Sequence, residues 1–193
     1  MASSHGIRWF WHGAILSGIA AVSLLSAAEP SLELVSVTRD VPERGKLPAA
    51  TMVQGKERNS FIVPAGWRLG LETKSGAVLL QSSEYAGMIE IRRMPLPENG
   101  ADWKTLREQI SEPAKPQEVR EDYAWVGTPN RAQVFDTSET MGSFKLHRRV
   151  CFMLREDHVL VISLLAREQG FVSCLRAFEI VLASLRQEQP ASP

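Results

Sequence analysis

The chain has 193 residues, of which 44% are hydrophobic and 23% are charged, and these fractions are those of an ordinary globular protein. The length allows a single domain with a hydrophobic core. Lysine plus arginine and aspartate plus glutamate number 22 each, and this balance excludes a global field that would favour nucleic acid or an anionic membrane.

Residues 1–28 have the pattern of a secretory signal peptide. Arg8 is the only arginine or lysine in this segment, an uncharged apolar run follows it, and the small residues Ser26 and Ala28 stand where signal peptidase requires them. We therefore expect cleavage before Glu29 and a periplasmic or secreted protein with no stable membrane insertion. The alternative is an uncleaved anchor, although the apolar run is shorter than the ~20 residues that span a bilayer.

Residues 29–56 are expected to add one edge strand and a loop. Apolar and polar residues alternate between Leu32 and Val37, as they do in a half-buried strand. The polar stretch that follows contains Pro42 and Pro48, and it is typical of a loop. The main domain is expected to span residues 57–187.

Residues 60–73 predict a tight turn between two strands. Pro64 has the fixed φ that suits the second position of a type I turn, and Gly66 suits the fourth position. The chain is therefore expected to reverse at once. Trp67 begins the next strand on its apolar face, where it would close one end of the core.

Two further strands are expected at residues 77–83 and 85–94. The period of the apolar residues then becomes helical at Trp103, Leu106 and Ile110. Asp102 is placed to cap the first turn of this helix, and Pro113 is placed to end it.

The second half of the chain predicts more strands and one long helix. Strands are expected at residues 118–127, 131–139, 144–157 and 158–166. Glu156 and Asp157 would form the tip of the hairpin between the last two. A helix from about Gly170 to Arg186 follows, with an apolar stripe made of Phe171, Leu175, Phe178, Leu182 and Leu185. This stripe must lie on the sheet, and residues 188–193, which have no apolar content to bury, are expected to be a disordered tail.

The order of these elements resembles the PsbP-like superfamily, which includes the extrinsic subunit of photosystem II and bacterial envelope proteins of the DcrB type. The motifs that carry the resemblance are Pro64, Gly66 and Trp67, and Ser184 to Arg186 at the end of the last helix. It implies an α+β fold, in which an antiparallel sheet of about six strands has helices on both faces. It transfers no catalytic residue, because the family shares no site. The absence of a cysteine near the cleavage site departs from the lipid-modified DcrB type.

The residue spacing does not favour an enzyme or a metal site. His147 and Cys151 are four residues apart on one strand, which separates their Cα atoms by ~13 Å, too far for a nucleophile and its base. Neither histidine nor cysteine has the spacing of a zinc site, and phosphate-loop and nucleophile-elbow motifs are absent. We therefore expect no cofactor and no catalytic residue.

Cys151 and Cys174 could lie at the same height, one on a strand and one on the last helix. If the hairpin tip is Glu156-Asp157, Cys151 pairs with Ile162 and the helix brings Cys174 over Ser163. A Cα separation of ~8 Å between sheet and helix would exceed the ~6.8 Å that a disulfide tolerates. Two buried, unreactive thiols are expected, and a disulfide is the alternative.

One group of basic residues is a candidate binding surface. Lys145, His147 and Arg149 share one face of a strand, and Arg92 and Arg93 lie on another strand. If the strands are close, these side chains would form a patch for an acidic protein, a lipid headgroup or an anionic glycan. The alternative is a solvated sheet edge whose charges prevent pairing with other chains.

The sequence therefore predicts an exported, non-enzymatic binding or assembly module of the cell envelope. It would act through its surface on an envelope partner protein. The basic patch would suit an anionic partner. The alternatives are a small-ligand-binding protein with a cleft between sheet and helix, where Trp103 or Trp125 would stack on the ligand, and an enzyme whose site cannot be found by spacing.

Overall fold

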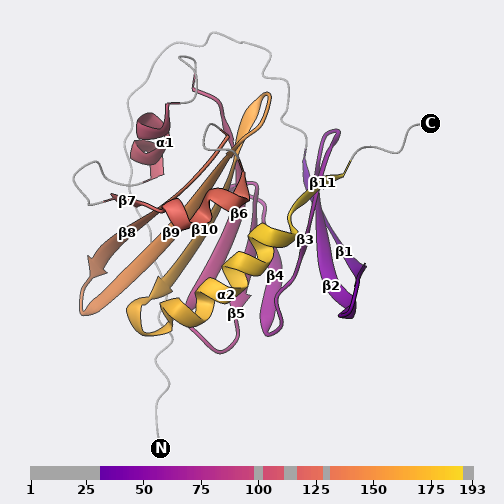
Figure 1. Cartoon of the computed structure of the whole chain (residues 1–193), viewed down its shortest axis with the longest axis horizontal. Helices are drawn as coiled ribbons and strands as arrows, with labels where there is room; N and C mark the ends of the chain where they lie inside the picture. The colour runs from indigo at the N-terminus through magenta and orange to yellow at the C-terminus, as the bar shows by residue number, and fades with distance from the viewer. Residues whose placement is uncertain (1–30, 98–101, 111–116, 128–130, 189–193) are drawn as a thin grey trace, which may run out of the picture.

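The computed structural model describes residues 31–97, 102–110, 117–127 and 131–188 (Figure 1). The predicted signal peptide, Pro113 and residues 189–193 lie outside this part of the chain. The strands are β1 (Leu32–Val41), β2 (Gly45–Gln54), β3 (Glu57–Ile62), β4 (Trp67–Glu72), β5 (Ala77–Ser82), β6 (Gly87–Pro95), β7 (Gln117–Val119), β8 (Ala132–Met141), β9 (Phe144–Leu154), β10 (His158–Arg167) and β11 (Arg186–Glu188). The helices are α1 (Trp103–Ile110), the 3₁₀ helix η1 (Glu121–Val126) and α2 (Glu168–Ser184).

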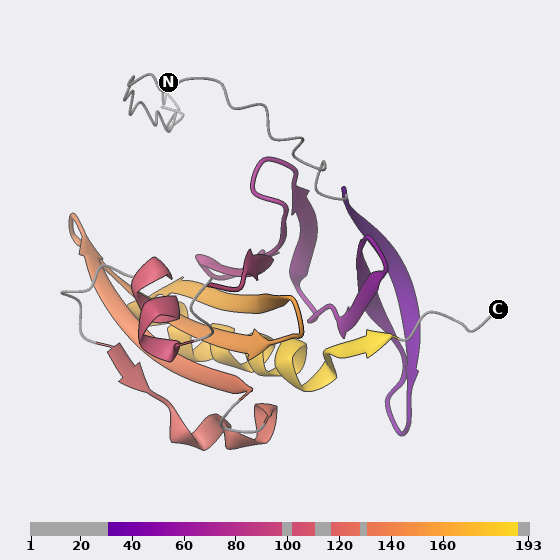
Figure 2. The same cartoon turned by 90° about the horizontal axis from the view of Figure 1, so that it is seen from above.

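The strands form two antiparallel sheets. The large sheet has the order β4-β5-β6-β10-β9-β8-β7, and the small sheet has the order β1-β2-β3-β11. Figure 2 shows the small sheet standing beside the large one. The fold is therefore α+β, as the sequence predicts, but the expected single sheet of about six strands is wrong, because the N-terminal strands and the C-terminal strand build a second sheet of their own.

Each face of the large sheet packs against a different helix. Alternate residues of β9 point to opposite faces, so that Cys151 belongs to the main hydrophobic cluster together with Phe178 of α2. Phe152 belongs to a second cluster, which contains Leu106 of α1. Helix α1 has only eight residues. It therefore does not form a full helical layer like the one expected on each face.

The expected loop after the first strand is instead strand β2, which pairs along its whole length with β1. Pro48 lies within β2 and is tolerated there because of its position. Its carbonyl accepts a hydrogen bond from the amide of Val63 at 3.0 Å, so its missing N–H also faces β3 rather than β1. The ladder between β1 and β2 is therefore intact, and the proline sits just beyond the last pair of β2 with β3, Ala49 with Ile62.

The turn at Pro64 differs from the predicted one in type and in role. The amide of Trp67 donates to the carbonyl of Pro64 at 3.2 Å, and Gly66 has a φ of 78°. Pro64 is thus the first residue of a type II turn and Gly66 is the third, which is the position that requires positive φ. The turn does not fold β4 back onto β3; it carries the chain from the small sheet into the large one. Trp67 packs against the main core but is only half-buried, because β4 is an edge strand.

The region predicted as a strand at residues 118–127 is mostly helical. Strand β7 ends at Val119, and η1 follows. Tyr123 and Val126 both pack against the main core, and a spacing of three suits a 3₁₀ helix rather than a strand. The predicted cap of α1 is confirmed, since the carboxylate of Asp102 accepts from the amides of Lys104 and Thr105 at 3.3 and 3.2 Å.

The hairpin of β9 and β10 and the following helix agree with the sequence. Cys151 pairs with Ile162, as predicted for a tip at Glu156-Asp157. Helix α2 begins at Glu168 and lies on the large sheet. Its buried residues are Cys174, Ala177, Phe178, Val181 and Leu182. The chain then enters β11, which pairs with β3, so Glu188 is in a strand and not in the expected tail. Within the described residues, no helix combines the length and apolar character needed to cross a membrane.

Candidate functional site

A cleft with a volume of about 840 Å³ lies between the two sheets. The turn between β2 and β3 and strand β11 line one side. The tip of the β9–β10 hairpin, the end of η1 and the last turn of α2 line the other side. The volume is within the range of small-ligand sites in proteins. We use the term "the cleft" for this space.

Arg155 and His158 form the wall of the cleft at the hairpin tip. The amide of Arg155 donates to the carbonyl of His158 at 2.9 Å, so the two residues are a directly opposed pair that closes the hairpin. Side chains of such a pair lie on the same face with Cβ atoms about 5 Å apart. Both residues line the cleft, and His158 is 4% exposed.

The ring of His158 is held by a carboxylate on each side. Its Nδ1 lies 2.6 Å from Oδ1 of Asp157, and its Nε2 lies 3.3 Å from Oε2 of Glu57. Nη2 of Arg93 is also 3.0 Å from Nδ1. Nδ1 cannot both donate to Asp157 and accept from Arg93, and we assign the proton to Nδ1 because the carboxylate contact is shorter. The hydrogen bond from His158 lowers the pKa of Asp157, which is consistent with an ionised Asp157.

Glu57 connects the two sheets at the cleft. It is the first residue of β3, and its Oε2 lies 3.5 Å from Nε of Arg93 on β6. Its Oε1 accepts a hydrogen bond from Asn59 at 2.9 Å. Although His158 Nε2 is 3.3 Å from Glu57, the geometry is too poor for a hydrogen bond, and Nε2 counts as a buried atom without a partner. Glu57 therefore offsets the charge of Arg93 across the cleft and leaves Nε2 of His158 without a hydrogen bond.

The remaining lining residues divide the cleft into a basic part and an apolar part. Lys56, Arg131 and Arg155 have no side-chain ion pair within the described residues, and Nε of Arg155 is buried without a hydrogen-bond partner. The apolar part is formed by Val126, Ala132, Met153, Leu154, Leu182 and Leu185. The cleft is thus suited to a ligand that offers both an acceptor and an apolar surface.

The described lining residues suit binding better than nucleophilic catalysis. None of them is a serine, threonine or cysteine, so Asp157 and His158 have no hydroxyl or thiol next to them to activate. In the described part of the chain, no group of three histidine, cysteine, aspartate or glutamate residues is arranged to hold a metal ion. What the cleft offers a ligand is a set of cationic donors.

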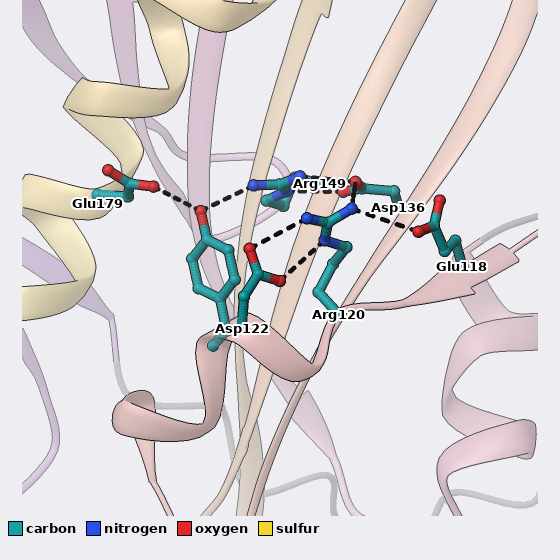
Figure 3. A network of polar contacts seen from close by, with 7 residues as sticks. Glu118, Arg120, Asp122, Asp136, Arg149 and Glu179 are labelled. Carbon is teal, nitrogen blue, oxygen red and sulfur yellow. Dashed lines mark hydrogen bonds and ion pairs between the residues drawn. The ribbon is translucent and has the colours of Figure 1, made fainter.

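The basic patch predicted from the sequence is not assembled as one surface. Arg149 is 6% exposed and belongs to a closed network (Figure 3). Its Nε and Nη2 donate to both oxygens of Asp136 at 2.7 and 2.6 Å, and its Nη1 donates to the hydroxyl of Tyr123 at 2.8 Å. Tyr123 in turn donates to Glu179 of α2 at 2.8 Å. Arg149 therefore connects the sheet, η1 and α2 and is not available to a partner.

The network around Arg149 shifts the pKa values of its members. Burial lowers the pKa of Arg149, but the hydrogen bonds and charge of Asp136 raise it further, so the guanidinium remains charged. Burial and the hydrogen bond to Glu179 raise the pKa of Tyr123 to about 12. Next to this group, Arg120 pairs with Asp122 at 3.0 Å. These contacts hold η1 against β8 and β9.

The other four residues of the predicted patch lie in separate places. Lys145 and His147 share a face of β9, as predicted, but both contact Glu168 of α2, at 2.7 and 3.4 Å. Arg92 and Arg93 alternate on β6, so they point to opposite faces of the sheet. Arg93 lines the cleft, whereas Arg92 lies 3.6 Å from Glu90. Of the five residues, only Arg93 contributes to the cleft.

The two tryptophans considered as stacking residues do not line the cleft. Trp103 packs against the second hydrophobic cluster under α1. Trp125 is 54% exposed and stacks on Tyr123, with ring centroids 5.8 Å apart. Its neighbour Val126 does line the cleft, so the end of η1 borders this site.

Cys151 and Cys174 are both buried and free, as the favoured interpretation of the sequence predicts. The predicted heights are wrong, because Cys174 does not lie over Ser163. A Cβ placed on Gly87 would meet Sγ of Cys174 at 2.4 Å, so Cys174 lies over Gly87 of β6, which pairs with Ala166. Cys151 pairs four residues earlier on β10, with Ile162. Burial raises the pKa of Cys151 to about 12 and also raises that of Cys174.

Sequence reasoning missed Glu57, Arg155 and His158 as a site. The sequence did contain a signal at the hairpin tip. Arg155 to His158 are four consecutive charged or ionisable residues, although a two-residue turn requires polar residues only at its two central positions. The contribution of Glu57 could not be read from spacing, because it depends on how the small sheet stands against the large one.

Comparison with known proteins gives structural likenesses only. No family model matches the chain, and no curated protein matches it. The fold is similar to the solution structure of cyanobacterial PsbP (CyanoP) from Synechocystis sp. PCC 6803, with a TM-score of 0.45 and 11% identity, over 90% of this chain and 99% of that chain. It is also similar to the crystal structure of LpqN, involved in cell envelope biogenesis of Mycobacterium tuberculosis, with a TM-score of 0.40 and 12% identity, over 82% and 92%. We take neither a family nor a function from these likenesses.

Proposed function

We propose that this protein is an exported, non-enzymatic binding module of the cell envelope, and that its binding site is the cleft between the two sheets. The observation that carries the proposal is the cleft itself, a space of about 840 Å³ that is lined by both cationic donors and apolar side chains. The proposed location rests on the signal-peptide pattern of residues 1–28.

The cleft supports binding of a small molecule better than action through a strand face. The face of β9 that carries Lys145 and His147 pairs with α2, and Arg149 is buried in a closed network. The cleft, in contrast, contains Arg155 with a buried Nε that has no partner. Unpaired donors in a concave, partly apolar site are what a bound ligand would satisfy.

A pair of variants on β11 tests whether the cleft is the binding site. Gln187 lines the cleft, and Gln187→Trp would fill part of it from an exposed strand position. Glu188 is the next residue, is not part of the lining and pairs with Arg58 at 3.6 Å. Neighbouring residues of a strand point to opposite faces, so Glu188→Trp is the matched control.

Native mass spectrometry of the proteins isolated from their own cells provides the measurement. We expect a small non-covalent adduct on the wild type and on Glu188→Trp, and its loss on Gln187→Trp. An equal adduct on all three proteins would place binding outside the cleft. No adduct on any of them, or an adduct that is chemically converted on incubation, would overturn the proposal of a non-enzymatic small-molecule binder.

A further inference from the structure

We propose that the ligand of the cleft is a small organic anion, in which a carboxylate or phosphate group is joined to an apolar body. This inference rests on the proposed function and adds the chemical class of the ligand. The anionic group would bind to Arg155, Arg131 and Lys56, and the apolar body would lie along the wall formed by Met153, Leu182 and Leu185.

The first observation is the state of the donors. Arg155 lines the cleft, and its Nε is a buried donor that has no hydrogen-bond partner. The opposed residue of the hairpin, His158, adds no second donor, because its proton is assigned to Nδ1. A buried donor of this kind requires an acceptor, and an anion is the acceptor that a cationic guanidinium binds most strongly.

The second observation is the balance of charge in the cleft. Its lining holds four basic side chains, Lys56, Arg93, Arg131 and Arg155, and three acidic ones, Glu57, Glu156 and Asp157. Asp157 is bonded to His158 at 2.6 Å, and Glu57 lies within 3.5 Å of Arg93. Arg93 is therefore compensated, and Glu156, at the exposed hairpin tip, is the remaining acid. Arg155, Arg131 and Lys56 are left to bind a ligand.

The third observation is the apolar wall. Leu182 and Leu185 come from the end of α2, Met153 from β9 and Val126 from η1, and all of them line the cleft. An inorganic anion would leave this wall in water. A ligand with an apolar body would cover it, and each buried methylene adds to affinity through the hydrophobic effect.

Four probes separate the two parts of the proposed ligand. Octanoate and octyl phosphate have an anionic group and an apolar chain, acetate has the charge alone, and octanamide has the chain without the charge. Isothermal titration of the purified protein below the micelle concentration gives the affinity of each. We expect octanoate or octyl phosphate to bind at least tenfold more tightly than acetate and octanamide, and the preference between them identifies the anionic group.

Three variants test the assignment of residues. Arg155→Gln should weaken binding of the preferred probe at least tenfold, because it removes a charge-assisted contact. Glu57→Gln removes a negative charge beside the donors and should strengthen binding several-fold. Arg68→Gln removes the same charge from an exposed position on β4 outside the cleft, and should leave the affinity unchanged. The melting temperature of each variant without probe shows that it is folded.

The outcomes distinguish this inference from the proposed function. If octanamide binds as tightly as octanoate, and Gln187→Trp abolishes both, the cleft binds ligands but not through an anion, and only the inference fails. If Arg155→Gln and Arg68→Gln bind octanoate alike, the assignment of the anion to the hairpin tip is wrong. If no probe binds and no adduct is found on the native protein, the proposed function fails as well.

Discussion

Arg149 lies in β9, and Arg155 follows the end of this strand with the same side-chain direction. The two arginines differ in whether their guanidinium groups have hydrogen-bond partners. Every guanidinium nitrogen of Arg149 donates a hydrogen bond of 2.8 Å or less, to Asp136 and Tyr123. Arg155 stands just beyond the end of the strand, and its buried Nε has no partner. The first is covered by η1 and α2, and the second opens into the cleft.

This difference separates a structural charge from a charge that can bind a ligand. A buried ion pair contributes to the folded state only when its geometry satisfies both partners, and the pair of Arg149 with Asp136 has that geometry. A buried donor without a partner is a cost to folding. Its presence in a cleft is therefore a better indication of a binding site than the number of basic residues on a strand, which is the criterion that led to the predicted patch.

The largest expected effect is on the closed network. Arg149→Met should lower the free energy of unfolding by about 3–5 kcal/mol, because it leaves Asp136 and the hydroxyl of Tyr123 without their donor. Urea denaturation measures this loss as a shift of the midpoint at constant slope. In the double variant with Asp136→Asn the two losses should not add, since the residues interact directly. A loss below ~1 kcal/mol would mean that the network does not stabilise the fold.

The second effect is a dependence of stability on alkaline pH. The pKa of Tyr123 is raised to about 12 in the folded protein, above the ~10 of an unfolded tyrosine. Between these values the folded state holds a proton that the unfolded state has lost, so stability is present below pH ~10 and falls as the pH rises toward 12. The decrease should be on the order of 2–3 kcal/mol, since each pH unit corresponds to about 1.36 kcal/mol. Tyr123→Phe should remove this part of the decrease, and an unchanged pH profile in the variant would contradict the assignment.

The third effect concerns the close packing of α2 against β6, where Cys174 lies over Gly87. Gly87→Ala would bring a Cβ to 2.4 Å from Sγ of Cys174. We expect a destabilisation of about 1–3 kcal/mol, because the helix or the strand must shift to make room. With Cys174→Ala present, the added cost of Gly87→Ala should become small, and thermal unfolding of the four proteins gives the coupling. Additive losses would show that Cys174 does not contact Gly87.

The sequence predicts the parts of the fold that depend on local pattern. The strands of the large sheet other than β7, the hairpin tip at Glu156-Asp157 and the cap at Asp102 follow from alternation, turn composition and side-chain chemistry. The sharing of one face by Lys145 and His147 was also predictable from the strand period. The prediction overlooked that α2 would cover this face and that Glu168 would contact both side chains. The apolar stripe of the helix already required it to lie on the sheet.

The cleft could not be predicted from local pattern, because its walls come from distant parts of the chain. Strand β2 contains Pro48 and several polar residues, a composition typical of a loop, yet β1 and β3 stabilise it from both sides. Strand β11 has only three residues, all exposed, and exists because β3 offers it an edge. The contact of Glu57 with His158 follows from the position of this second sheet. Tertiary pairing thus decided what intrinsic propensity did not.

The smallest expected effect on stability is at Arg155, the arginine whose buried Nε has no partner. Arg155→Gln should change the free energy of unfolding by less than ~0.5 kcal/mol, or even raise it, because the variant loses no side-chain partner and no longer buries part of a charged group without one. The same urea titration that is used for Arg149→Met measures it, and the two arginines then serve as controls for each other. A loss as large as that of Arg149→Met would show that Arg155 has a structural role in the folded protein. Arg149, which is fully hydrogen-bonded, and Arg155, which lacks a partner, would then no longer differ in their contribution to stability. The main argument for a ligand at the hairpin tip would fail with this difference.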